Sequence, residues 1–167
     1  MRTRTDYLEC IFDHDNLQVK LDEAIATLEK KEFDIIACRG VSGLLFASIL
    51  AYKMHKGLVV IRKPEHSSHS YLKVEGIVPS RGDKWLIVDD FMSSGRTVAE
   101  IISRLGRHNT PGLIGAYMYK HKGFRTRGYV LSTCSMLVDY SKEDKYACSD
   151  VCSNELQQGG REPSPYV

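Results

Sequence analysis

Two neighbouring carboxylates and a run of small hydroxyl residues stand a few positions apart in the middle of the chain. Asp89 and Asp90 follow the apolar residues Trp85–Val88, and Ser93–Thr97 spell Ser-Ser-Gly-Arg-Thr. The apolar run predicts a buried strand, and the residues that follow have the spacing of an amphipathic helix. We therefore expect the acidic pair to stand where a strand ends, and the small residues to stand where a helix begins.

Each half of this segment suits a different part of a sugar phosphate. Small residues let backbone N–H groups close around an anion, and a helix N-terminus adds partial positive charge. The hydroxyls of Ser93, Ser94 and Thr97 can donate further hydrogen bonds to a phosphate. Adjacent carboxylates are poor partners for phosphate but accept hydrogen bonds from a vicinal diol. Ribose 5-phosphate has this combination of groups; the alternative is an ordinary turn with an acidic residue near the helix cap.

The segment Leu86–Thr97, LIVDDFMSSGRT, resembles the fingerprint of the type I phosphoribosyltransferases. It is not a Walker phosphate loop, because no Gly-Lys-Ser/Thr ending is present. The resemblance implies that Asp89 and Asp90 are catalytic and hold the ribose hydroxyls, and that Mg²⁺ arrives with the substrate and reaches them through water. It also implies a 5-phosphate loop made of Met92, Ser93, Ser94, Gly95, Arg96 and Thr97.

Two further segments resemble the diphosphate-binding parts of the adenine-type members of that family. Ala37–Gly43 (ACRGVSG) looks like their Ala-Arg-Gly stretch, and Val59–Glu65 (VVIRKPE) looks like a strand that ends in Arg-Lys. The alternative for the first is a plain turn with a surface arginine. The resemblance implies that the diphosphate is bound by Arg39, Gly40, Arg62 and Lys63.

The long segment 64–81 differs from its neighbours, being polar with alternation only near its end. Within it, Ser70–Gly76 is similar to the flexible lid of the adenine enzymes, which makes Tyr71 a lid residue. Ser93 stands where the hypoxanthine–guanine enzymes carry an aspartate, so the resemblance favours adenine over a 6-oxopurine. Leu137–Asp144 (LVDYSKED) is similar to the end of the last core strand in those hypoxanthine–guanine enzymes, which makes Asp139 a further candidate for a place near the base.

Apolar patterning predicts an α/β fold with a mostly parallel sheet and helices on both faces, because strands alternate with helices along the chain. The type I phosphoribosyltransferase fold would add a lid hairpin and a small hood from the chain ends. Ser42 is the expected N-cap of the second helix. We expect helices at 15–31, 42–54 and 95–108, and strands at 33–38, 57–63, 84–90, 113–120 and 128–140.

One domain accounts for most of the chain. We expect it to span residues 1–155, with a core at about 33–140, and the polar residues 156–167 to form a disordered tail. Family resemblance suggests a homodimer. The five cysteines are scattered and odd in number, so we expect no disulfide framework; Cys148 and Cys152 lack a second pair at zinc-site spacing.

Composition excludes several classes of function. A net charge of +2 argues against a dedicated nucleic-acid protein, and no apolar run approaches the roughly 20 residues of a membrane span. The N-terminus carries acidic residues before any apolar run, unlike a signal peptide, so we expect a cytoplasmic protein.

The sequence therefore predicts a phosphoribosyltransferase: a pentosyl glycosyltransferase that joins phosphoribosyl diphosphate (PRPP) to a nucleobase, most simply a purine, in nucleotide salvage. Its partners would be these small molecules, without nucleic acid or membrane. Two alternatives remain: a non-catalytic homologue that senses PRPP or a nucleotide, and a hydrolase or phosphotransfer protein with the same phosphate cradle.

Overall fold

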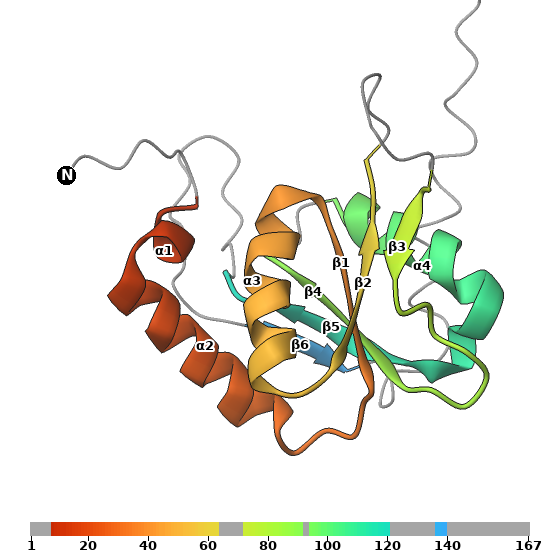
Figure 1. Ribbon diagram of the computed structural model, residues 1–167, viewed down its shortest axis with the longest axis horizontal. Coiled ribbons are helices and arrows are strands. Elements are labelled where there is room, and N and C mark those ends of the chain that lie inside the picture. The colour runs from red at the N-terminus through yellow and green to blue at the C-terminus, as the bar shows by residue number, and fades with distance from the viewer. Residues whose placement is uncertain (1–7, 64–71, 92–93, 121–135, 140–167) are drawn as a thin grey trace, which may run out of the picture.

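The computed structural model of the chain describes residues 8–63, 72–91, 94–120 and 136–139 (Figure 1). Its helices are α1 (Glu9–Phe12), α2 (His14–Leu28), α3 (Gly40–Lys53), α4 (Arg96–Asn109) and the short 3₁₀ helix η1 (Thr110–Gly112). Its strands are β1 (Ile35–Arg39), β2 (Gly57–Ile61), β3 (Val74–Gly76), β4 (Trp85–Asp89), β5 (Leu113–Met118) and β6 (Met136–Asp139).

The strands form a six-stranded sheet in the order β3-β2-β1-β4-β5-β6. The four inner strands run parallel, whereas β3 pairs antiparallel with β2, and β6 pairs antiparallel with β5. Parallel neighbours need a crossover, and α3 and α4 supply it between β1 and β2 and between β4 and β5. The predicted α/β fold is confirmed, and the carboxyl ends of the parallel strands meet at one edge.

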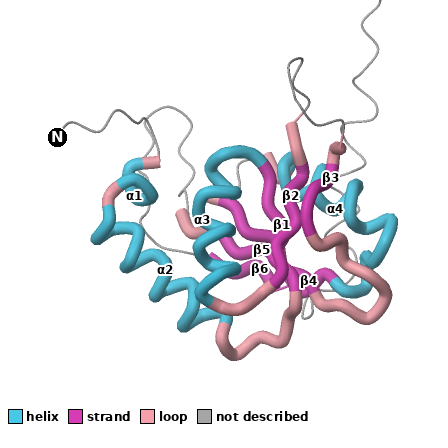
Figure 2. Tube along the Cα trace, in the orientation of Figure 1, coloured by secondary structure: helices cyan, strands magenta, loops and turns pink. Residues whose placement is uncertain are grey.

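Helices cover both faces of the sheet, and each face has its own core (Figure 2). Alternate residues of a strand point to opposite faces, so Ile36 and Cys38 of β1 pack with the buried side chains of α2 and α3. Ile35 and Ala37 pack instead with Val98, Ile101 and Leu105 of α4. Near-continuous apolar strands are therefore required here, since both sheet faces are buried.

Glycine conformation explains the one helix start that sequence patterning placed wrongly. The structure begins α3 at Gly40 with Arg39 as the N-cap residue, and not after an N-cap at Ser42. Gly40 has a φ of 72°, which lets the chain turn out of β1 and enter the helix at once. Helix α2 has a side-chain N-cap: it starts after Asp13, whose carboxylate accepts a hydrogen bond of 2.9 Å from the Asn16 N–H.

Three short elements are not among the expected helices and strands, namely α1, β3 and η1. β3 lies in the polar segment 64–81, and it pairs antiparallel with β2 at one edge of the sheet. Of the strand expected at 128–140, the structure describes β6 at its end. The expected lid residue Tyr71, the loop residues Met92 and Ser93, Cys148 and Cys152, and the tail 156–167 lie outside the described residues.

In the part of the chain that the structure describes, no helix has the length and apolar character needed to cross a membrane.

Candidate functional site

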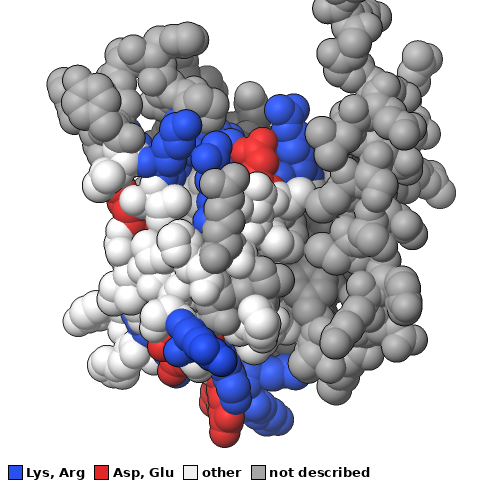
Figure 3. Space-filling model, turned by 90° about the vertical axis from the view of Figure 1, so that its right-hand side faces the viewer, with Lys and Arg blue, Asp and Glu red and all other residues white. Residues whose placement is uncertain are grey.

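A pocket of about 210 Å³ opens at the edge where the parallel strands end. It is bounded by the ends of β1 and β4, the residues after β2, and the first turn of α4. Lysine and arginine side chains gather along the upper edge of the face in Figure 3, where β1 and β2 end in Figure 1. The pocket is lined by Arg39, Ser42, Lys63, Asp89, Asp90, Phe91, Ser94, Gly95, Arg96, Thr97 and Val98.

The acidic pair is buried and held by backbone hydrogen bonds. Asp89 is 4% exposed and Asp90 6% exposed. The N–H of Asp90 donates to Asp89 Oδ1 at 2.9 Å, and the N–H of Phe91 donates to Asp90 Oδ1 at 2.9 Å. The carbonyls of the pair accept from the N–H groups of Tyr119 (3.1 Å) and Lys120 (2.6 Å). The two residues that follow β5 therefore fix the backbone at the end of β4, where both carboxylates enter the pocket.

Burial makes Asp89 an unusual acid. Its pKa is raised from 3.8 to about 7, first because burial disfavours the carboxylate, and then because Asp90 stands beside it. The ammonium group of Lys63 acts in the opposite direction and lowers the pKa. Positive charge brought close to the pair would therefore favour the ionised form of Asp89.

This pKa predicts a pH dependence of stability. Between about pH 4 and pH 7 the folded protein retains a proton on Asp89, whereas the unfolded chain has released it. The contribution of Asp89 to the free energy of unfolding therefore falls as the pH rises through this range, and it is constant above about pH 7. Asp89→Asn should abolish this pH-dependent change in the free energy of unfolding, which amounts to at most about 4 kcal/mol. Urea unfolding at a series of pH values should therefore show the variant gaining stability over the wild type as pH rises. A difference that does not change with pH would contradict the assignment.

The start of α4 forms the second wall of the pocket. Gly95 has a φ of 75°, and its carbonyl accepts the Ala99 N–H at 2.9 Å to begin the helical hydrogen bonds. The Ser94 hydroxyl lies 3.4 Å from the Arg96 N–H. The first N–H groups of a helix have no partner within it, so this turn can receive a phosphate between Ser94 and Thr97.

Arg39 and Lys63 bring positive charge from two different strands. Arg39 is the last residue of β1, and Lys63 follows β2. The Lys63 side chain crosses over Gly40, where an added Cβ would lie 2.9 Å from Lys63 Cε. The absence of a side chain at Gly40 therefore leaves room for the lysine beside the pocket. The structure thus brings two of the three expected cations, Arg39 and Lys63, to the pocket that holds the acidic pair.

Two candidates are placed elsewhere. The Arg62 guanidinium donates to Glu75 Oε1 of β3 at 2.6 Å, and Arg62 is absent from the pocket lining. Asp139 ends β6, which is antiparallel, so it pairs with Gly115 near the start of β5. It therefore stands towards the opposite edge of the sheet from the pocket.

Sequence patterns did not reveal several contacts that shape the site. The Tyr119 hydroxyl donates to the Ser42 carbonyl at 3.0 Å, and its ring stacks on Phe46 with centroids 4.3 Å apart. This anchors the first turn of α3 to β5. Glu100 forms an ion pair with Arg39. The only sequence signal for Glu100 is its place one turn after Arg96, which is ordinary helix spacing.

Comparison with known proteins agrees with this geometry. Residues 9–123 match the family described as the phosphoribosyl transferase domain. Adenine phosphoribosyltransferase from Pseudothermotoga lettingae is 32% identical over 53% of this chain and 62% of its own length. The same-named protein of Agathobacter rectalis is 31% identical over 60% of this chain and 67% of its own length. The chain thus spans about two thirds or less of the length of these relatives.

Solved structures share the fold. Adenine phosphoribosyltransferase from Rhodothermus marinus has a TM-score of 0.55 at 18% identity, covering 69% of this chain and 72% of that one. Orotate phosphoribosyltransferase from Aeropyrum pernix has a TM-score of 0.54 at 23% identity, covering 68% and 63%. With the family match extending over residues 9–123, which include both walls of the pocket, the chain belongs to the phosphoribosyl transferase domain family.

Proposed function

We propose that this protein transfers the 5-phosphoribosyl group of PRPP to a purine base and releases diphosphate. The observation that carries the proposal is the meeting of three groups at one pocket: a buried acidic pair, an open helix N-terminus and two cations from neighbouring strands. A phosphate, a diol and a diphosphate on one ribose need those three kinds of partner. The family match supports the same substrate class.

The charges and hydrogen-bonding groups of the pocket indicate where each part of PRPP would bind. The 5-phosphate fits the first turn of α4, where Ser94 and Thr97 line the pocket and the first N–H groups of the helix have no partner within it. The ribose hydroxyls would then donate to Asp89 and Asp90. Arg39 and Lys63 remain for the diphosphate, whose oxygens accept hydrogen bonds from both.

The reaction breaks the bond between the anomeric carbon and a diphosphate oxygen and forms a bond from that carbon to a base nitrogen. The bonding electrons leave with the diphosphate, whose added charge Arg39 and Lys63 would stabilise. Positive charge grows on the ribose ring, and the buried carboxylates of Asp89 and Asp90 stabilise it at short range. The proton on the attacking nitrogen passes to solvent if the acceptor is easily deprotonated, so no further base is required.

The pocket residues fit Mg²⁺ bound through the substrate. The described residues hold no group of three or more His, Cys, Asp or Glu that could bind a metal by itself. Mg²⁺ usually keeps several waters and binds one or two carboxylates together with substrate phosphates. Asp89 and Asp90 would meet those waters, and positive charge close to the pair would lower the raised pKa of Asp89. When bound, Mg²⁺ neutralises charge on the departing diphosphate.

Adenine is the first choice of acceptor. The Ala-Cys-Arg-Gly stretch at residues 37–40 and the Ile-Arg-Lys stretch at residues 61–63 support it. The names of the two curated relatives described above support it too.

A diphosphate-release assay tests the proposal. Purified protein, PRPP and Mg²⁺ are incubated with adenine, hypoxanthine, guanine, xanthine, orotate, uracil or nicotinamide, and without base. We expect release that depends on a purine, fastest with adenine. Release without any base would indicate a hydrolase, and PRPP binding without release for any base would indicate a sensor; either result would contradict the proposal.

A further inference from the structure

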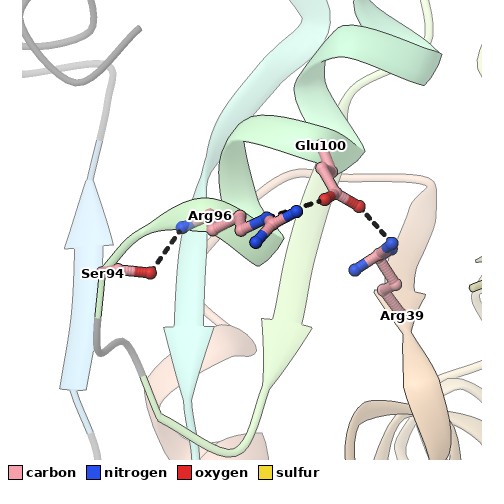
Figure 4. Close-up of polar contacts among 4 residues, drawn as sticks. All are labelled: Arg39, Ser94, Arg96 and Glu100. Atoms are coloured by element: carbon pink, nitrogen blue, oxygen red, sulfur yellow. Dashed lines mark hydrogen bonds and ion pairs between the residues drawn. The ribbon is translucent and has the colours of Figure 1, made fainter. Parts of the chain in front are cut away.

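Glu100 lies where two arginines of the pocket meet, as Figure 4 shows. One oxygen, Oε2, pairs with Nη2 of Arg39. The other, Oε1, lies 3.3 Å from Nε of Arg96. Arg39 comes from the end of β1 and Arg96 from the first turn of α4. One carboxylate therefore joins the strand proposed to bind the diphosphate to the helix proposed to bind the 5-phosphate.

Burial shows which of the two contacts matters. The side chain of Arg39 is 11% exposed, Glu100 35% and Arg96 74%. An ion pair with an exposed arginine contributes little, whereas a buried guanidinium depends on its partner. Glu100 is the only ion-pair partner of Arg39 among the described residues, and Nε of Arg39 is buried without a hydrogen-bond partner. The orientation of Arg39 thus rests on Glu100.

The carboxylate holds Arg39 without occupying the pocket. Both arginines line the pocket, and Glu100 does not. The guanidinium has five N–H donors, so a contact through Nη2 leaves others for an anion. A long side chain that is already held loses less conformational freedom when it binds its ligand. Glu100 therefore has the position of a support for Arg39 and not of a competitor for it.

We propose that Glu100 is a positioning residue that orients the Arg39 guanidinium for the diphosphate group of the substrate. This inference rests on the proposed function, since it takes the diphosphate as the ligand of Arg39. It assigns no contact with substrate to Glu100 itself. It also predicts that the effect of Glu100 passes through Arg39 and falls on diphosphate more than on the 5-phosphate.

The test is calorimetric titration of the full chain with inorganic diphosphate and, separately, with ribose 5-phosphate. Glu100→Gln keeps the size of the side chain and removes its charge. We expect the Kd for diphosphate to rise about threefold to tenfold, and the Kd for ribose 5-phosphate to change by less than about twofold. With PRPP and adenine, KM for PRPP should rise and kcat should fall, because Arg39 would both bind the diphosphate and stabilise the charge that it gains on leaving. A purely structural role would instead lower the binding stoichiometry for both ligands.

A double-variant cycle and a control complete the experiment. In an Arg39→Ala background, Glu100→Gln should no longer alter diphosphate binding. Glu32→Gln removes a comparable but exposed pair with Lys84, and should leave both Kd values unchanged. Tighter diphosphate binding by Glu100→Gln, or no change, would overturn this inference alone. A wild-type protein that binds neither ligand would overturn the proposed function and this inference with it.

Discussion

Exchange of both pocket carboxylates, Asp89→Asn together with Asp90→Asn, is expected to lower kcat/KM for PRPP by roughly 10³-fold or more. The two carboxylates are the only acidic side chains that line the pocket in the described part of the chain. They would stabilise the positive charge that grows on the ribose ring, and they would hold its hydroxyls. Asparagine keeps the shape of aspartate and removes both negative charges. Diphosphate release with saturating adenine measures the effect.

The same variant should remain folded, which separates lost chemistry from lost structure. The amide oxygen of asparagine can accept the N–H groups of Asp90 and Phe91 as the aspartate oxygens do. The cost of burying a charged carboxylate and the repulsion from Asp90, which together raise the pKa of Asp89, both disappear, so thermal stability above pH 7 should be equal or higher. A matched control, Asp15→Asn with Asp22→Asn, removes two exposed carboxylates from α2 and should keep full activity. Unchanged diphosphate release by the pocket variant would contradict the assigned roles.

Gly76→Ala is expected to lower the free energy of unfolding by about 3 kcal/mol or more. Gly76 ends β3 with a φ of 106°. An added Cβ would lie 2.2 Å from the Leu58 carbonyl oxygen and 3.1 Å from Val59 Cα, both of them backbone atoms of β2. Neither can move aside without opening the pairing of the two strands. Urea unfolding of the purified variant measures the loss.

Gly82 offers a matched control for that substitution. Its φ is 105°, nearly the same as that of Gly76, but an added Cβ would meet nothing within 4 Å. Gly82→Ala therefore carries only the backbone strain, roughly 1–2 kcal/mol. The difference between the two variants isolates the clash with β2. Equal losses for both would show that the contact with Leu58 relaxes freely.

Displacement of β3 in the Gly76→Ala variant would also affect the pocket. β3 pairs with β2, and Glu75 of β3 holds Arg62. Lys63 is the next residue after Arg62 and lines the pocket. We therefore expect the folded fraction of the Gly76→Ala variant to bind diphosphate more weakly, because the end of β2 would lose its pairing with β3.

The sequence alone determined the local unit that delivers the acidic pair. A buried strand, two carboxylates and a Gly-turn into a helix are encoded within residues 85–97, and short-range patterning suffices to predict them. The alternation of strands and helices likewise predicted the parallel sheet. The family resemblance assigned Arg39 and Lys63 to the diphosphate, and the shared edge of the parallel strands is what brings them near Asp89.

Only the tertiary structure decided which neighbouring charges belong to the pocket. Arg62 and Lys63 are adjacent in sequence, yet alternation along β2 and the partner Glu75 direct Arg62 to β3. Asp139 stands towards the far edge, because β6 runs antiparallel. Burial and the neighbouring carboxylate raise the pKa of Asp89, and an ion pair between distant segments joins Glu100 to Arg39. Local sequence patterns predict neither of these features.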